Sequence, residues 1–300
     1  MARILLTGRS GQVGSELLKT LARLGEVVAP VRAEMDLADI SAVREIVRNV
    51  RPRWIVNPAA YTAVDKAESE PELAYAINRD AVRAIGEEAQ AIGAGVIHFS
   101  TDYVFDGTKN GPYFEEDITG PASVYGASKL AGEQALTASG AAHMIFRTSW
   151  VYGATGKNFL RTILRLARER DVIRVVDDQH GAPTWSRDLA RMAAHAIARV
   201  ESVAAGKSLS ETMTDWGGIY HAAGSGETTW CGFASEAVSL ACEQEPGTRF
   251  AEVEAISTSE YPTPAKRPLN SRMSSAKLMT RFGWTMMDWR DSLREVLAEL

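Results

Sequence analysis

A glycine-rich segment follows the first apolar run of the chain and limits how the chain can fold. The apolar run Ile4–Thr7 leads into Gly8-Arg9-Ser10-Gly11-Gln12-Val13-Gly14, and a segment of helical period follows over 12–24. Glycines at such a turn allow close packing of helix on strand and close approach of the backbone to a pyrophosphate, which the first helical amides can bind. The spacing is GxxGxxG rather than GxGxxG, and the turn could serve geometry alone. Its place after an N-terminal strand nevertheless favours dinucleotide binding by Gly8, Gly11 and Gly14.

The rest of the first half of the chain alternates apolar runs with segments of helical period. Further strands are expected at 27–31, 54–57, 96–100 and 144–149, and helices at 40–49, 71–92 and 125–138. This alternation predicts an α/β fold of the Rossmann type, with a doubly wound parallel sheet.

The domain organisation changes after about residue 150, where loops lengthen and prolines interrupt the chain. We expect residues 1–150 to form an NAD(P)-binding domain and 151–300 to form a smaller C-terminal substrate lobe that is discontinuous in sequence. Later segments near 158–176 and 185–222 are expected to contribute to the first domain. The small and polar stretch 204–215 is expected to be a surface loop.

Charge, hydropathy and cysteine content exclude several classes of protein. The formal net charge of −5 argues against a nucleic-acid partner. The chain has neither a bilayer-length apolar run nor the hydrophobic region of a signal peptide before Thr7. Cys231 and Cys242 are expected on one helix, about 16 Å apart at 1.5 Å per residue, which is too far for a disulfide. We therefore expect a cytoplasmic protein without membrane contact, either a monomer or a homodimer.

The end of the second expected strand bears on the choice of cofactor. A carboxylate there would bind the ribose hydroxyls and select NAD. The segment Ala29-Pro30-Val31-Arg32 has none, and Arg32 together with Arg9 could bind a 2′-phosphate. The sequence therefore favours NADPH or tolerance of both NADPH and NADH, whereas two solvated surface arginines are the alternative interpretation.

Tyr125 and Lys129 are four residues apart and so share one face of a helix. A phenol has a pKa of about 10 in water, and a neighbouring ammonium is expected to lower the pKa of Tyr125 toward the range of a general acid. The polar residues Ser100, Thr101 and Asp102 emerge at the C-terminal end of the fourth strand, where open α/β sheets bind ligands. The Thr101 hydroxyl could donate to a substrate carbonyl oxygen. Together these features predict an oxidoreductase, although the Tyr-x-x-x-Lys spacing alone could mark an exposed helix face.

Several longer segments extend these motifs along essentially the whole chain. They are Asn57–Asp65, Ser100–Phe105, Val124–Gly126 with Lys129, Arg147–Tyr152, Gly181–Thr184, and Tyr261–Ala265 with Arg267-Pro268 and Asn270-Ser271. With these segments the chain resembles the extended short-chain dehydrogenases/reductases, and most closely the dTDP-4-dehydrorhamnose reductases among them. The segments around Trp150 and Arg267 are the more specific ones.

The resemblance implies an activity and the residues that perform it. The activity is NAD(P)H-dependent reduction of the C4 keto group of dTDP-4-dehydro-L-rhamnose to dTDP-L-rhamnose, the last step in making this dTDP-sugar for cell-surface polysaccharide such as lipopolysaccharide. Tyr125 would be the proton donor, Lys129 would hold the nicotinamide ribose, and Thr101 would assist. The cofactor would also contact Gly11, Gln12, Val13, Asp36, Leu37, Ala60, Tyr61, Thr62 and Phe99.

The resemblance also implies contacts with the sugar substrate. Thr101, Asp102 and Tyr125 would touch the sugar, and Trp150 would pack on the hexose ring, with ordinary core packing as the alternative for this indole. Arg267 is a candidate for bidentate binding of the substrate diphosphate, and a structural salt bridge is its alternative.

A metal site is the point at which the chain departs from some members of the family. Those members dimerise around Mg²⁺ held by glutamates, and Glu16 and Glu299 stand at two of those places. Arg187 stands where a third glutamate is expected. The sequence therefore predicts no metal site, with Mg²⁺ at a dimer interface as the alternative.

Two other functions are compatible with the same fold. One is a nucleotide-sugar epimerase or dehydratase, which would return the hydride and release no oxidised cofactor. The other is a non-catalytic NADP-binding subunit, like the regulatory β subunit of methionine adenosyltransferase. The presence of Thr101, Tyr125 and Lys129 together argues against the second.

Overall fold

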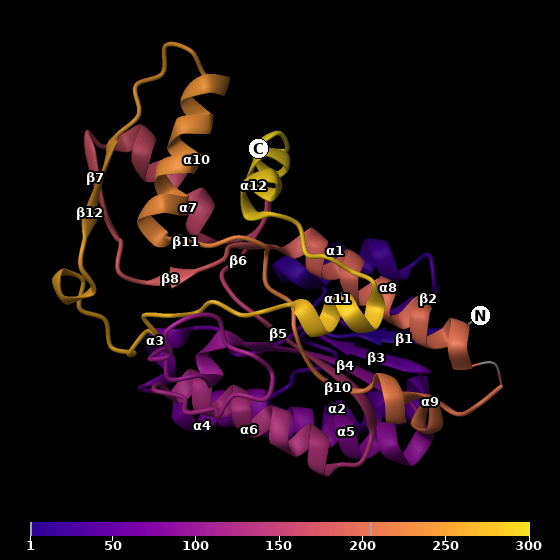
Figure 1. Cartoon of the computed structure of the whole chain (residues 1–300). Coiled ribbons are helices and arrows are strands. Elements are labelled where there is room, and N and C mark those ends of the chain that lie inside the picture. Colours follow the sequence, from indigo (N-terminus) through magenta and orange to yellow (C-terminus); the bar gives the residue numbers. More distant parts are fainter. Residues whose placement is uncertain (1, 205) are drawn as a thin grey trace.

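The computed structural model describes residues 2–204 and 206–300, which form two lobes (Figure 1). The larger lobe is built on a six-stranded sheet with the strand order β10-β5-β4-β3-β1-β2, in which all neighbours are parallel. Its strands are β1 (Ala2–Leu6), β2 (Gly25–Val28), β3 (Trp54–Asn57), β4 (Gly95–Thr101), β5 (Ala142–Thr148) and β10 (Gly218–His221). The strand order reverses between β1 and β3, and ligands of open α/β sheets bind in the crevice at such a reversal. The predicted fold class is confirmed.

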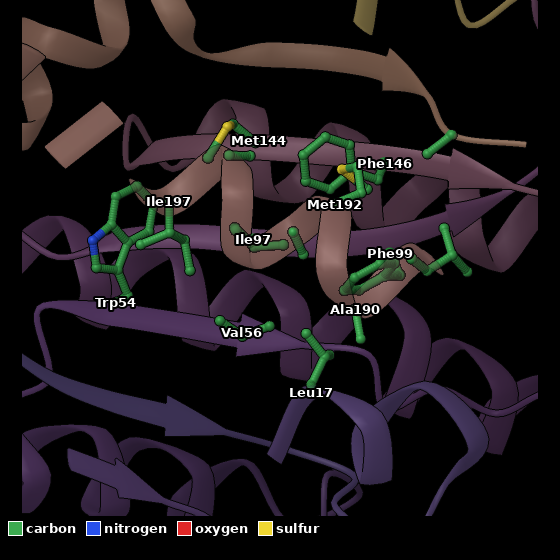
Figure 2. Packing of buried hydrophobic residues seen from close by; sticks show 14 of the residues in the cluster. Leu17, Trp54, Val56, Ile97, Phe99, Met144, Phe146, Ala190, Met192 and Ile197 are labelled. Carbon is green, nitrogen blue, oxygen red and sulfur yellow. The ribbon is translucent and has the colours of Figure 1, made fainter. Parts of the chain in front are cut away.

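Helices cover both faces of this sheet, as a doubly wound fold requires (Figure 1). One face carries α1 (Gln12–Leu21), α8 (Ser186–Ala204), α9 (Leu209–Trp216) and α11 (Ala276–Phe282), and the other carries α2 (Ile40–Val50), α5 (Ala81–Ile92) and α6 (Val124–Ala138). Figure 2 shows the packing on the first face, where Leu17 and Met192 from the helices meet Val56, Ile97 and Phe146 from the strands. Burial of these side chains holds the helices on the sheet. Because all neighbouring strands are parallel, their C-terminal ends lie at one edge of the sheet.

The helical stretch expected at 71–92 is interrupted by one wide turn. Helix α4 (Pro71–Tyr75) passes through a π-helical turn at Ala76–Asp80 into α5. The turn buries Asn78, whose amide bonds to the backbone of Tyr61 and to the Ser128 hydroxyl on α6. The π turn therefore ties the loop after β3 to the helix that carries Tyr125.

The smaller lobe is assembled from separate parts of the second half of the chain. Its elements are α7 (Phe159–Glu169), β7 (Val172–Val176), α10 (Trp230–Gln244), β12 (Glu252–Ile256) and α12 (Trp289–Leu297). Short strand pairs join it to the larger lobe, namely β6 (Val151–Tyr152) with β9 (Thr184–Trp185) and β8 (His180–Gly181) with β11 (Thr228–Thr229).

Of the two later segments that were expected to contribute to the first domain, one does not. Segment 158–176 does not join the six-stranded sheet, because β7 pairs with β12 and the apolar face of α7 packs on α10. Segment 185–222 does contribute α8 and β10 to the larger lobe, and α11 also returns there. The roles of the two lobes in binding cofactor and substrate stay a prediction.

The stretch 204–215 is largely helical rather than a loop. Residue 205 lies outside the described residues, and α9 begins at Leu209 with a capping box in which Ser208 and Glu211 bond to each other's backbone amides. Cys231 and Cys242 are free and lie on α10, as expected. Across the described ranges, none of the helices has the length and apolar character that crossing a membrane needs.

Candidate active site

The glycine turn forms a close-packed cradle between β1 and α1. Gly8 has a φ of +58°, and a Cβ atom added to it would lie 2.9 Å from the Cβ of Ala59. A Cβ atom on Gly14 would lie 2.0 Å from the carbonyl oxygen of Gly8. Side chains at these positions would hold helix and strand apart and strain the turn. The cradle has the backbone geometry that a bound pyrophosphate needs, so its residues fit a dinucleotide.

A small pocket of about 300 Å³ opens beside the turn at the end of β2. Of the predicted cofactor residues it is lined by Gly8, Arg32, Asp36, Leu37 and Ala60. Arg32 forms an exposed ion pair with Asp36, and Arg9 donates to the carbonyl oxygen of Ala29. Both guanidinium groups therefore lie at the rim where the adenosine half of a dinucleotide would end.

A larger cleft of about 660 Å³ continues from the same turn along the C-terminal ends of β1, β3, β4 and β5. Most of the predicted site residues meet in it. They are Gly8, Gly11, Gln12, Val13, Gly14, Ala60, Thr62, Phe99, Thr101, Asp102, Tyr125, Lys129 and Trp150.

Tyr61 and Arg267 do not line this cleft. The phenol of Tyr61 donates to Glu70, and its backbone amide donates to Asn78. The guanidinium of Arg267 forms a bidentate pair with Asp65, at 2.8 and 3.2 Å. For Arg267 the structure therefore shows the salt bridge that was the alternative to diphosphate binding.

Tyr125 lies in the first turn of α6, where the side chain of Ser123 caps the helix by accepting from the amide of Gly126. Burial raises the pKa of Tyr125 to about 12, and its hydrogen bond with Thr101 acts in the opposite direction. The expected lowering of this pKa by Lys129 is absent in this structure: burial is the largest effect, and Thr101 rather than Lys129 opposes it. A phenol with such a pKa is protonated at neutral pH and can donate a proton.

Asp102 lies next to Thr101 at the end of β4 and is fully buried. Burial raises the pKa of its carboxyl group to about 6, and hydrogen bonds from Ser271 and Thr101 oppose the rise. The Thr101 hydroxyl donates to Asp102 over 3.0 Å, and the Ser271 hydroxyl donates to its other oxygen. Ser271 belongs to a segment 169 residues further along the chain, so this contact fixes the C-terminal part of the chain against the cleft.

Lys129 is buried at the base of the same cleft, 2 % exposed. Its ammonium donates to the carbonyl oxygen of Phe99 over 2.7 Å, and Nζ lies 3.3 Å from Nε2 of His98. Burial lowers the pKa of Lys129 to about 8, and the Glu133 carboxylate acts in the opposite direction. The Phe99 carbonyl oxygen thus takes one of the three donor directions of an ammonium, and His98 can take a second when its Nε2 carries no proton, which leaves the third for a ligand.

Trp150 combines core packing with a place in the cleft. Its indole stacks on Trp230 at 3.7 Å between ring centroids, and a Cβ atom on Gly181 would lie 2.7 Å from it. Its backbone φ is +47°, which is a strained conformation for a large side chain. Trp230 was not predicted from the sequence, nor was Asn158, whose amide donates to the Gln12 side chain over 2.9 Å.

Comparisons with known proteins agree with this geometry. A family model described as the RmlD substrate binding domain matches residues 2–300. A dTDP-4-dehydrorhamnose reductase of Burkholderia thailandensis is 46% identical, covering 96% of this chain and 95% of the relative. One from Escherichia coli K12 is also 46% identical, covering 99% of this chain and 97% of the relative. The chain belongs to the dTDP-4-dehydrorhamnose reductase family. The crystal structure of a Bacillus anthracis dTDP-4-dehydrorhamnose reductase in complex with NADP superposes with a TM-score of 0.87 at 35% identity, covering 100% of this chain and 99% of that chain.

The magnesium site expected for some dTDP-4-dehydrorhamnose reductases does not fit the residues of this chain. The guanidinium of Arg187 donates to Glu16 over 3.0 Å and forms a bidentate pair with Glu299. Lys19 donates to the other oxygen of Glu16 over 2.9 Å. Both carboxylates are therefore neutralised by cations of the chain itself. Within residues 2–204 and 206–300, no cluster of three His, Cys, Asp or Glu side chains could hold a metal ion.

We expect neither EDTA nor added Mg²⁺ to change the melting temperature or the molecular mass of the wild-type protein. The matched variant is Arg187→Glu, which places a third carboxylate beside Glu16 and Glu299. It should lose about 2 kcal/mol of stability without metal, because charge-assisted hydrogen bonds are replaced by repulsion, and regain much of it with Mg²⁺. Differential scanning fluorimetry and mass photometry measure both quantities. A wild-type protein that EDTA destabilises would contradict the expectation.

Proposed function

We propose that this chain catalyses the NAD(P)H-dependent reduction of the C4 keto group of dTDP-4-dehydro-L-rhamnose to dTDP-L-rhamnose. The observation that carries the proposal is the meeting of Tyr125, Lys129 and Thr101 in one cleft with the glycine cradle, at the carboxyl edge of the sheet. The relatives of the chain that bear this name, at 46% identity over nearly their whole length, support the substrate.

The order of the strands determines where each part of a bound dinucleotide would lie along the cleft. Residues 11–14 would hold the pyrophosphate with backbone amides at the start of α1, and the pocket at the end of β2 would take the adenosine. A nicotinamide dinucleotide bound in this direction would supply the hydride that reduces the keto carbon. The free donor of Lys129 would then bind the ribose near the reacting centre.

Tyr125 would complete the reduction by giving its phenolic proton to the carbonyl oxygen as negative charge develops there. Thr101 lines the same cleft as this phenol. The Thr101 hydroxyl donates a hydrogen bond to Asp102, which fixes the position of the threonine side chain. Trp150 would form one wall for the hexose, and its stack on Trp230 would hold that wall rigid.

The reaction is tested by incubating the protein with dTDP-4-dehydro-L-rhamnose and each reduced cofactor. We expect the 340-nm absorbance to fall by one equivalent per sugar, and the product to have the rhamno configuration at C4 by NMR. An epimerase or dehydratase would change the sugar without net consumption of NAD(P)H. A protein that binds NADPH but turns over neither sugar nor cofactor would support the non-catalytic alternative.

We further propose that the rim arginines favour NADPH over NADH. Arg32→Ala is expected to weaken NADPH binding about fivefold, or about 1 kcal/mol, because an exposed guanidinium contributes little to one phosphate contact. The affinity for NADH should stay within experimental error, since NADH has no 2′-phosphate. Fluorescence titration of both cofactors measures the two affinities, and Arg23→Ala serves as a control for the loss of one surface charge. An equal loss for both cofactors would exclude a 2′-phosphate contact.

A further inference from the structure

A row of buried polar side chains crosses three neighbouring strands under the cleft. Thr7 follows β1, Asn57 ends β3, and His98 lies in β4. The register places them side by side, because Leu6 is opposite Val56 and Asn57 is opposite His98. All three are at most 3 % exposed. Polar groups that are buried in a sheet need hydrogen-bond partners, and these three find them in one another.

The row is hydrogen-bonded from end to end. The Thr7 hydroxyl donates to Oδ1 of Asn57 over 2.6 Å, and Nδ2 of Asn57 donates to Nδ1 of His98 over 3.1 Å. The remaining ring nitrogen of His98, Nε2, lies 3.3 Å from Nζ of Lys129. The row therefore runs from the residue before the glycine cradle to the amine at the base of the cleft.

We propose that Asn57 and His98 are positioning residues for Lys129, and that the imidazole of His98 changes tautomer when Lys129 gains or loses its proton. An ammonium has donors only, so Nε2 must accept from it, and the ring proton must then lie on Nδ1. An uncharged amine can accept, so Nε2 can carry the proton and donate to Lys129. The ring stays neutral in both states.

Asn57 and Thr7 can form hydrogen bonds with either tautomer of His98. With the ring proton on Nε2, Nδ1 accepts from the Asn57 amide, as the structure shows. With the ring proton on Nδ1, the amide must turn so that Oδ1 faces the ring and Nδ2 faces Thr7. A hydroxyl both donates and accepts, so Thr7 completes the row in either direction. One proton is exchanged with solvent at Lys129, and one moves between the two ring nitrogens.

Of the two titratable groups in direct contact in the row, His98 and Lys129, only Lys129 has a pKa close to neutral. Burial lowers the pKa of His98 well below its usual value, and the nearby charge of Lys129 lowers it further. Burial also lowers the pKa of Lys129, to about 8. The other charged or titratable groups that face the row are Tyr125 and Glu133 on α6, and His143 and Arg147 on β5. Glu133 and Arg147 are paired with each other, and burial holds the pKa of Tyr125 at about 12.

The inference rests on the role of Lys129 in the proposed function, but its first test needs no turnover. The chain has five histidines, so the ring nitrogens of the ¹⁵N-histidine-labelled full-length protein can be followed by NMR from pH 6.5 to 10. The signals that His98→Gln removes belong to His98. We expect them to change from the Nδ1–H to the Nε2–H tautomer, with the midpoint of the Lys129 titration seen in ¹³Cε-lysine spectra. One tautomer throughout, or an imidazolium within this range, would overturn the proposal.

Lys129→Met is the matched control for the tautomer change. This variant removes the titrating amine and keeps a side chain of similar length, so the His98 tautomer should become independent of pH. A tautomer change that persists without Lys129 would overturn the proposal. If the protein does not reduce the sugar but His98 still changes tautomer with pH, the proposed function is contradicted and the proposal for His98 and Lys129 is supported.

The second test separates positioning from ordinary packing through the pH profile of kcat. The working form of Lys129 is the ammonium, so activity is present below its pKa and is lost as pH rises through it. His98→Leu removes the acceptor and should move the alkaline limb about one pH unit lower, since a lost charge-assisted hydrogen bond disfavours the ammonium. His98→Gln offers Oε1 as an acceptor and should keep the limb near its wild-type position. If both variants have a lower kcat but the alkaline limb of the pH profile stays at the same pH, His98 serves only in packing and the proposal is contradicted.

Discussion

Replacing Tyr125 with phenylalanine is expected to lower kcat by about 10²- to 10⁴-fold, which is the usual contribution of a positioned general acid. The variant removes the phenolic proton and keeps the ring. Edge-to-face packing on Tyr103, at 5.4 Å between centroids, should therefore persist. The affinity for NADPH should change little, because the glycine cradle and Lys129 are untouched. Stopped-flow reduction of the sugar and fluorescence titration of NADPH measure the two quantities separately.

Tyr103→Phe provides the comparison within the same cleft. Tyr103 also lines the cleft and is, like Tyr125, partly buried, so the two variants perturb the apolar surroundings similarly. Its hydroxyl is not the proposed proton donor, and we expect a far smaller loss of kcat. Wild-type-like turnover by Tyr125→Phe, or equal losses in the two variants, would contradict the assignment of Tyr125 as the proton donor.

The parts of the site that could be predicted from the sequence are those set by local geometry. The glycine turn has its spacing within seven residues, from Gly8 to Gly14, and its chemistry follows from a strand that precedes it and a helix that follows. Tyr125 and Lys129 share one helical face because of the helical period alone. The end of β4 could be located because a continuous apolar run stops at polar residues. Each of these signals is complete within one element.

The contacts that the sequence did not reveal join residues far apart in the chain. Thr7 and His98 lie in one row only because β1, β3 and β4 are neighbours in one register. The bond between Asp102 and Ser271, and the stack of Trp150 on Trp230, likewise depend on tertiary packing. A motif search cannot detect such pairs, because neither partner has a distinctive spacing. A polar residue within or at the end of each buried apolar run is the signal in the sequence that could have indicated this row of side chains.

Two errors of the sequence analysis have different physical causes. Segment 158–176 has the alternation of a further helix and strand, but this pattern does not determine which sheet the strand joins. In the structure β7 pairs with β12 in the smaller lobe. The start of α9 was overlooked although Ser208 and Glu211 have the spacing of a capping box. The first error concerns topology, which local pattern does not determine. The second concerns a local signal that the small polar residues around it obscured.

The ion pair of Glu133 and Arg147 joins α6, which carries Tyr125 and Lys129, to β5, and breaking it is expected to produce a large loss of stability. Nη2 of Arg147 lies 2.7 Å from Oε2 of Glu133, and the two side chains are only 3 % and 2 % exposed. The Ser100 hydroxyl also donates to Glu133, which joins β4, β5 and α6 below the cleft. Arg147→Leu would leave a carboxylate buried without its cation, at a cost of about 3–5 kcal/mol.

Urea unfolding of Arg147→Leu, Glu133→Leu and the double variant separates two contributions to stability. One is the attraction between the two charges, and the other is the cost of burying a charge that has no partner. Each single variant should lose about 3–5 kcal/mol, whereas the double variant should lose much less than their sum, because no charge is then left unpaired. Glu169→Ala breaks the exposed pair with Arg165 on α7 and should cost about 0.5 kcal/mol or less. Additive losses in the double variant would mean that the two residues stabilise the fold independently. Tyr125 and Lys129 are placed by α6, so the single variants should also lose kcat at urea concentrations at which they are still folded. The double variant should recover part of the lost kcat if the ion pair acts only by holding α6 in position.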